Sequence, residues 1–250
     1  MALQPVDYAT YAALRDLDLS HPDVDATAPP PDGTDTWVLG HASSWARWSN
    51  TTDDVAAITA HSPDEFESLE PLTTSVVVLT TNQAADSPAG ARIWGAFHHD
   101  DDITVADSVR RTYERTGPIP APYLTDIFKL LPAPTTELDS QIEQERDQNR
   151  DHVGRCAQIL QQELSLCVDG SDGTTPTLVA VGGAAYTWLS GRDWNTGKPI
   201  VDQRIADTVN EVLGEGANRR VEWVPHFNPG VATHDQRATA LAAILARANL

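Results

Sequence analysis

The sequence predicts an α/β protein with a three-layer α/β/α domain and a short, mostly parallel central sheet of about four strands. Four short apolar runs alternate with stretches of helical periodicity, which is typical of a parallel sheet covered by helices on both faces. A chain of 250 residues, 40% of them hydrophobic, is long enough to bury such a core. We expect residues 71–250 to form this domain and residues 1–70 to form a helical and loop extension that packs on it.

The first 70 residues are expected to be short helices joined by loops. Three stretches have the composition of short helices: residues 8–17, 53–61 and 63–69. Residues 23–35 are rich in Pro, Asp and Gly, which is typical of a loop. Three tryptophans lie close together in this segment, and we expect them to pack into the protein rather than to stack on a ligand. They are Trp37, Trp45 and Trp48.

Four strands are expected in the rest of the chain, because four apolar runs are rich in β-branched residues and are followed by turn residues. They cover residues 75–81, 123–128, 177–181 and 220–224. Helical periodicity predicts helices at residues 104–116, 137–167, 182–189, 201–213 and 235–248. In the fourth of these helices one side is apolar, formed by Val201, Ile205, Val209 and Val212.

The charge of the chain is strongly negative. Acidic residues outnumber Lys and Arg by 36 to 17, which gives a net charge of −19. This balance argues against broad, non-specific binding of nucleic acid, although it is compatible with a local basic groove. No apolar run approaches the roughly 20 residues of a membrane span. The N-terminus also lacks the features of a secretory signal, so we expect a cytoplasmic protein without a membrane partner.

The two cysteines are expected to be buried thiols. Cys156 and Cys167 lie 11 residues apart on one predicted helix. That spacing separates them by about 16 Å, and a disulfide needs Cα atoms within about 7 Å.

Several polar residues and a pair of glycines lie at or just after the ends of the four predicted strands, whose carboxyl ends meet at one edge of a parallel sheet. They are Asn82, Gln83, Asp126, Lys129, the pair Gly182–Gly183, His226 and Asn228. Together with the aromatic Phe97, an amide, a carboxylate and a histidine are suited to recognise a flat polar ring. The sequence has no nucleophile elbow, phosphate-binding loop or zinc-protease motif, and no His/Cys cluster with ligand spacing. We therefore expect no metal and no cofactor.

Five segments, in this order, resemble the motifs of the uracil-DNA glycosylase superfamily, and in particular its small bacterial and archaeal branch. The segments read VVVLTTNQA, WGAFHHDD, PYLTDIFK, TLVAVGGAAYTWL and VEWVPHFNPG. The resemblance covers residues 75–248. It implies a DNA glycosylase that removes uracil or another deaminated base, with water as the nucleophile and no covalent intermediate. The final loop departs from the family's usual His-Pro-Ser, because Phe227 and Asn228 follow His226 here.

The resemblance also implies roles for individual residues. Asn82 would position or polarise the attacking water, and His226 would stabilise negative charge on the leaving base. Phe97 would stack on the base, and Asp126 would read its edge. The candidate substrate contacts are Gln83, Phe97, Asp126 and Asn228. Physical chemistry agrees with these roles, because cleavage develops negative charge on the base and requires the nucleotide to leave the stack.

The expected partner is DNA, possibly single-stranded, bound by a monomer through a small basic patch. The patch would consist of Arg110, Arg111, Arg115 and Lys129. Phe227 would either fill the gap left by a flipped base or belong to the core, and Asp126 could instead form a surface ion pair with Lys129. Two other functions remain open. One is a nucleic-acid- or partner-binding module of the same fold without catalysis. The other is an N-glycoside hydrolase for small nucleosides or nucleotides, which would tolerate the acidic surface better.

Overall fold

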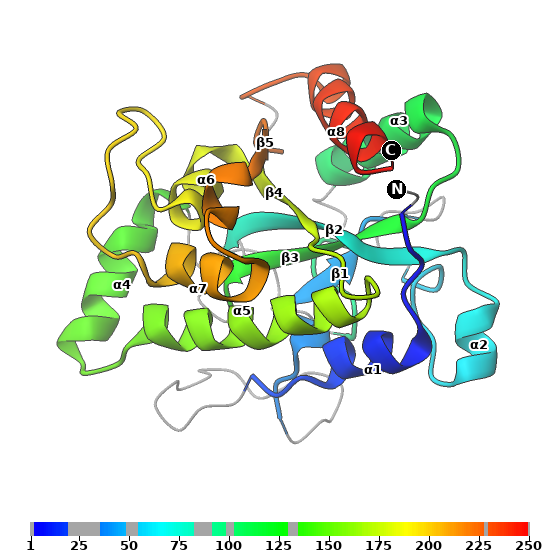
Figure 1. Cartoon of the computed structure of the whole chain (residues 1–250), viewed down its shortest axis with the longest axis horizontal. Coiled ribbons are helices and arrows are strands. Elements are labelled where there is room, and N and C mark those ends of the chain that lie inside the picture. The colour runs from blue at the N-terminus through cyan, green and yellow to red at the C-terminus, as the bar shows by residue number, and fades with distance from the viewer. Residues whose placement is uncertain are drawn as a thin grey trace.

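The computed structural model contains one mixed sheet with helices on both faces (Figure 1). It describes residues 3–19, 36–48, 55–82, 92–98, 103–129, 135–227 and 230–249. The strands are β1 (Ser43–Trp45), β2 (Leu72–Asn82), β3 (Ala121–Phe128), β4 (Thr177–Val181) and β5 (Glu222–Val224). The sheet has the strand order β1-β3-β2-β4-β5, in which β1 is antiparallel to β3 and all other pairs are parallel.

The α-helices are α1 (Tyr8–Asp16), α2 (Pro63–Glu67), α3 (Ile103–Thr116), α4 (Leu138–Asp147), α5 (His152–Asp169), α6 (Gly182–Ser190), α7 (Arg204–Leu213) and α8 (His234–Ala248). Three short 3₁₀ turns cover Leu39–His41, Thr135–Glu137 and Ala217–Arg220. In Figure 1, α3 and α8 lie above the sheet, whereas α1, α5 and α7 lie below it. The predicted three-layer α/β/α fold is therefore confirmed.

Alternation along the strands divides the core between the two sheet faces. On β2, Val76 and Val78 belong to the buried cluster that includes α3 and α8 residues. Val77 and Leu79 belong to the other cluster, which includes residues of α1, α5, α6 and α7. Because helices cover both faces, β2 and β4 are buried at nearly every position rather than at alternate ones, and each contains an unbroken run of apolar residues. This is why the β-branched runs were a good guide to β2 and β4.

The N-terminal segment contributes a strand to the sheet, which the sequence did not predict. Strand β1 pairs with β3 in the register Trp45↔Tyr123, so the sheet has five strands rather than about four. Three residues are too few to show a period, and two of them are serines. As predicted, the nearby tryptophans are buried: Trp37, Trp45 and Trp48.

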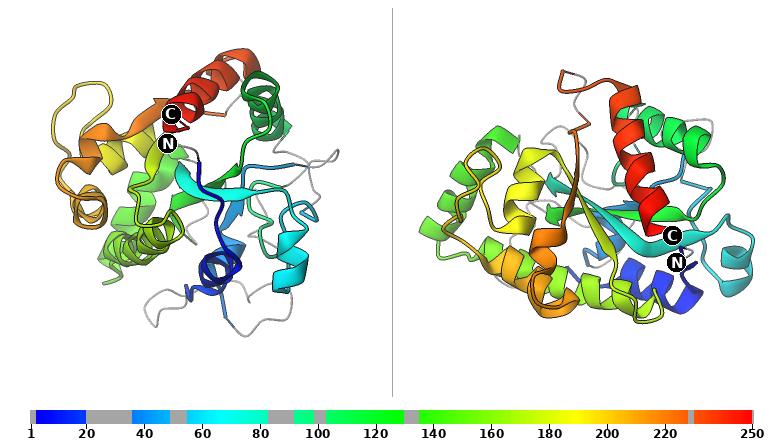
Figure 2. Two further views of the ribbon diagram at one scale, coloured as in Figure 1. Left: turned by 45° about the vertical axis from the view of Figure 1, so that its right-hand side comes forward. Right: turned by 45° about the horizontal axis from the view of Figure 1, so that its top comes forward.

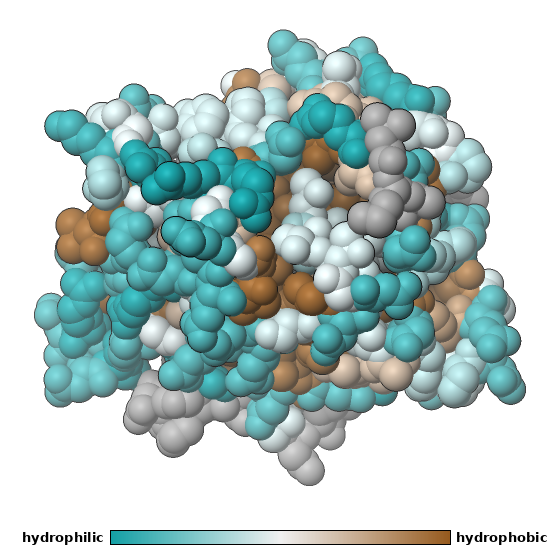
Figure 3. Space-filling view, in the orientation of Figure 1, coloured by the Kyte–Doolittle hydropathy of each residue, from teal (hydrophilic) through white to brown (hydrophobic). Residues whose placement is uncertain are grey.

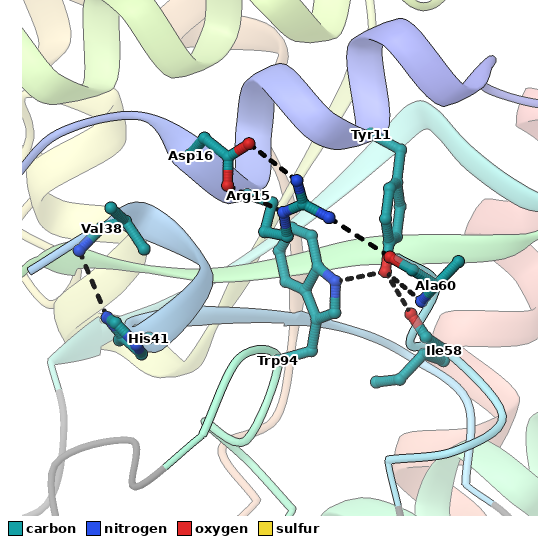
Figure 4. Close-up of polar contacts among 8 residues, drawn as sticks. All are labelled: Tyr11, Arg15, Asp16, Val38, His41, Ile58, Ala60 and Trp94. Carbon is teal, nitrogen blue, oxygen red and sulfur yellow. Dashed lines mark hydrogen bonds and ion pairs between the residues drawn. The ribbon is translucent and has the colours of Figure 1, made fainter. Parts of the chain in front are cut away.

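A polar network joins the N-terminal segment to the rest of the protein (Figure 4). The Tyr11 hydroxyl accepts hydrogen bonds from Trp94 Nε1 at 2.6 Å and from the Ala60 amide at 3.0 Å, and it donates to the Ile58 carbonyl at 2.9 Å. The two termini also meet, because the Leu3 amide donates to Asn249 Oδ1 at 2.9 Å (Figure 2). The described parts of residues 1–70 and 71–250 thus share one sheet and both buried clusters.

Several predicted element boundaries differ from the observed ones. The helix expected at 137–167 is two helices, α4 and α5, separated by a turn in which Asn149 has a φ of +58°. Asp151 starts α5 by accepting a hydrogen bond from the Gly154 amide at 3.1 Å. Helix α7 begins at Arg204, which leaves Val201 outside it and fully exposed. Residues 55–60 form turns rather than the expected short helix, and the predicted 23–35 loop lies outside the described residues.

Both cysteines are free and buried on α5, as expected. Among the described residues, no helix is long and apolar enough to cross a membrane.

Candidate functional site

Three of the predicted site residues lie at the carboxyl ends of the parallel strands. Asn82 ends β2 and is half-buried, Asp126 is near the end of β3, and His226 follows β5 by two residues. Strand β4 lies between β2, which carries Asn82, and β5, which precedes His226. These two strands are therefore separated by two strand spacings of about 4.8 Å each. The turn from β4 into α6 at Gly182 occupies this interval. Gln83 and Asn228 lie outside the described residues.

Gly182 is required for the position of His226. Its φ is +85°, which L side chains rarely adopt. A Cβ at this position would lie 2.9 Å from His226 Cδ2, so the imidazole packs directly on the glycine. The backbone of His226 is held from α8, because Arg237 Nε donates to its carbonyl at 2.7 Å.

The surroundings of His226 favour its neutral form. Burial lowers the pKa of this histidine, and the nearby charge of Arg237 lowers it further. A neutral imidazole offers one N–H donor and one acceptor. Such a donor can face a developing negative charge without carrying a positive charge into the ground state.

Asp126 is buried on the sheet face that carries α3. It shares this face with Leu124, two residues earlier on β3, and is 4% exposed. The Thr80 hydroxyl of β2 donates a hydrogen bond to its carboxylate. The alternative role of Asp126, a surface ion pair with Lys129, is wrong, because the Lys129 ammonium contacts the Asp126 backbone carbonyl.

Lys129 lies in an ionic cluster between β3 and α5 and is 2% exposed. Its Nζ is 3.1 Å from Glu163 Oε2 and 2.5 Å from Thr125 Oγ1. The Tyr123 hydroxyl donates to the same Glu163 carboxylate at 2.8 Å. Burial, together with the Glu163 charge, holds the pKa of Tyr123 well above its usual value. Lys129 therefore cannot contact a phosphate, which corrects the prediction that it belongs to a DNA-binding patch.

The other members of the predicted basic patch lie on α3 and are partly neutralised. Arg111 and Arg115 both approach Asp235 of α8, at 2.8 and 3.4 Å. Arg110 lies 3.5 Å from Asp107.

Phe227 is not available as a wedge, because it is 8% exposed and belongs to the core cluster that includes α8 residues. Of its two expected roles, the core role is the one observed.

Phe97 is half-buried and has a φ of +67°. Its segment lies beside β1: the Ser44 hydroxyl donates to the Trp94 carbonyl at 2.9 Å, and His98 stacks on Trp48 with ring centroids 4.6 Å apart. Strand β1 is at the opposite side of the sheet from β5. Phe97 packs against the buried cluster that contains Leu124 and Phe227, on the sheet face that carries α3 and α8.

Trp194 is an aromatic residue at this edge that the sequence interpretation missed. A Cβ on Gly183 would lie 2.9 Å from Trp194 Cδ1, so the indole packs on Gly183 as His226 packs on Gly182. The indole is stacked on Trp223 with centroids 4.7 Å apart, yet Trp194 is 43% exposed. The only sequence signal for this residue is that a tryptophan stands among polar residues typical of a turn. In the structure this turn is held by Asp193 Oδ1, which accepts a hydrogen bond from the Thr196 amide at 2.8 Å.

Comparison with known proteins identifies no family for this chain. No protein-family model, curated protein or solved structure matches this chain. Among the described residues, no three His, Cys, Asp or Glu side chains are grouped so that they could hold a metal ion.

Two histidines make the stability of the protein depend on pH. Burial lowers the pKa of His226 and of His152. As the pH falls through about 6.5, the unfolded chain takes up protons that the folded protein resists, so the free energy of unfolding should fall. The free energy of unfolding should stop falling once the pH is below the lowered pKa values. It should not change on account of these histidines above about pH 7.5, where both are uncharged in the folded and in the unfolded protein.

Urea denaturation at a series of pH values measures this decline, which should be on the order of 1 kcal/mol. His226→Gln and His152→Gln should each reduce it. The exposed His61 provides the matched control, because His61→Gln should leave the decline unchanged. An equal decline in all three variants and the parent protein would contradict the assignment.

Proposed function

We propose that this protein hydrolyses the N-glycosidic bond of uracil or another deaminated base. The observation that carries the proposal is the placement of Asn82 and His226 at the carboxyl edge of the parallel strands, on either side of the Gly182 turn. The bond carries a base that becomes negatively charged as it leaves. An N–H donor at a base oxygen stabilises that charge by about 3–4 kcal/mol where the geometry matches.

In this mechanism the two residues act on opposite sides of the bond. The Asn82 amide orients a water molecule toward the sugar carbon, and the His226 N–H donates to the departing base. Water is the nucleophile, because Lys129, the lysine that follows the β3 strand, is committed to Glu163. The reaction should therefore leave no adduct that borohydride can trap, and it should proceed in the presence of a chelator.

DNA is the proposed carrier of the base, in keeping with the motif resemblance. Arg111 and Arg115 each share their charge with Asp235, so few phosphate contacts are available. Binding to DNA should consequently be weak and should depend only shallowly on salt.

A small nucleoside or nucleotide is the second candidate substrate. The net charge of −19 disfavours a substrate with many phosphates, and the buried Lys129 cannot contact one. A substrate with few phosphates is affected by neither feature. The two carriers are separated by one set of assays. Base release is measured by chromatography from free deoxynucleosides and from single- and double-stranded oligonucleotides containing uracil, hypoxanthine or xanthine. Release from neither would contradict the proposal and favour a binding module without catalysis.

Recognition of the base is proposed to depend on Asp126. A carboxylate can accept a hydrogen bond from uracil N3–H, but it faces the O4 lone pairs with repulsion. The Thr80 hydroxyl donates to this carboxylate and fixes its position, and the carboxylate has no N–H to offer to O4. Hypoxanthine and xanthine likewise place a carbonyl oxygen beside this N–H, so the carboxylate should disfavour all three bases relative to an amide at this position.

Asp126→Asn should therefore raise the release of uracil by about tenfold over the parent protein, because the amide can accept from N3–H and donate to O4, and a mispaired polar contact costs roughly 1–3 kcal/mol. Release is measured with the same oligonucleotides for both proteins. Asp64→Asn, an exposed carboxylate on α2, is the matched control and should leave the release unchanged. Unchanged release by Asp126→Asn would show that this residue does not read the base.

A further inference from the structure

A cavity of about 700 Å³ lies between α4, the start of α6 and the loop that joins α6 to α7. This is within the range of about 300–1,000 Å³ of small-molecule sites. Its apolar wall is formed by Leu138, Ile142, Trp188, Trp194, Ile200 and Val201. Neither Asn82, Asp126 nor His226 lines it, so it is distinct from the proposed hydrolytic site.

Apolar exposure is concentrated at this cavity. Among the described residues, three large hydrophobic side chains are exposed: Trp194, Val201 and Val231. Trp194 and Val201 both line the cavity. Figure 3 shows a small apolar patch at the left edge of this face, near the loop that Figure 1 draws after α6, and further apolar areas nearer the centre. Exposed apolar surface inside a hollow is typical of a binding site.

The polar lining of the cavity is mostly acidic. Its charged members are Asp139, Glu143, Asp193 and Asp202, with Arg146 as the one base, and Thr187 and Asn195 are its neutral ones. Asp193 accepts from Thr196, and Asp202 forms an ion pair with Arg204 at 2.6 Å. Arg146 exerts its charge on Asp202, whose pKa is lowered mainly by its hydrogen bond to Arg204.

Two carboxylates are left to face a ligand. Asp139 and Glu143 lie one turn apart on α4, are exposed, and have no ion pair or hydrogen bond from their side chains among the described residues. They flank Ile142, which is part of the apolar wall. A ligand that fits both features must combine a positive charge with an apolar body.

We propose that this cavity binds an organic cation, namely an amine with an apolar or aromatic body. The body lies against Trp194 and Ile142, and the ammonium group faces Asp139 and Glu143. The partly exposed indole adds attraction for a cation near its face. Phosphate-bearing molecules are disfavoured by the same carboxylates, so this site is not a second nucleotide site.

The test measures binding of 2-phenylethylammonium to the full chain by calorimetry at low salt. The neutral alcohol of the same shape, 2-phenylethanol, is measured in parallel. The cation should bind at least about tenfold more tightly, and this difference should shrink at about 0.5 M salt because the carboxylates are solvent-accessible. Equal binding of the alcohol, or no binding of the cation, would overturn the proposal.

Variants locate the site. Asp139→Asn/Glu143→Gln should weaken binding of the cation about fivefold to tenfold. Asp64→Asn/Glu67→Gln on α2 removes the same number of exposed charges elsewhere and should leave binding unchanged. An equal loss in the two double variants would mean that overall charge, not this cavity, attracts the cation. Trp194→Leu should weaken binding of the cation more than binding of the alcohol. Loss of the stack on Trp223 would affect both ligands alike, so the difference between them reports the attraction between the indole and the cation.

Discussion

Replacing His226 by Ala should lower the rate of base release by about 10²–10³-fold, because a positioned donor to a developing charge contributes about 3–4 kcal/mol. Thermal unfolding should change little by comparison, since the His226 contact with Arg237 is made through its backbone carbonyl. The measurement is single-turnover release of base from an oligonucleotide or nucleoside on which the parent protein is active. A variant that keeps full activity would exclude His226 from the reaction.

A second substitution tests whether the position of His226 matters as well as its presence. In Gly182→Ala the new Cβ would lie 2.9 Å from the imidazole and displace it, so activity should fall by at least about tenfold. Gly117→Ala is the matched control, because Gly117 has a similar φ of +75° and no atom within 4 Å of its Cβ position. If both variants lose the same activity, backbone strain rather than displacement of His226 is the cause.

Lys129→Met should lower the free energy of unfolding by about 3–5 kcal/mol. Lys129 and Glu163 have side chains that are 1% and 0% exposed, so the substitution leaves a carboxylate buried without its counter-charge. Urea denaturation at neutral pH measures the loss. The exposed pair of Arg111 and Asp235 provides the control, because Arg111→Met should cost at most about 1 kcal/mol.

The double variant Lys129→Met/Glu163→Gln distinguishes a buried charge from lost packing. The glutamine removes the unpaired charge and keeps an acceptor for the Tyr123 hydroxyl. The double variant should therefore be more stable than Lys129→Met alone. If it is equally or less stable, the loss in the single variant arises from packing at the β3–α5 interface rather than from the Glu163 charge.

The central strands and the layered fold could be predicted from the sequence alone. Strands β2, β3 and β4 are buried on both faces, so their apolar and β-branched runs are continuous and visible without a partner. For β4 the predicted and observed bounds are the same, residues 177–181. The placement of Asn82 and His226 at one edge also follows from the sequence, because parallel strands bring their carboxyl ends together.

Only the tertiary structure decided which polar residues are available at that edge. Strand β1 is three residues long and exists through its pairing with β3, which no local pattern encodes. Lys129 and Asp126 are three residues apart, yet the Lys129 ammonium is paired with Glu163 of α5 and the Asp126 carboxylate with Thr80 of β2. Trp194 reaches Gly183 through a turn. Partner choice and burial depend on contacts between distant segments, and a single sequence records the residue types but not those contacts.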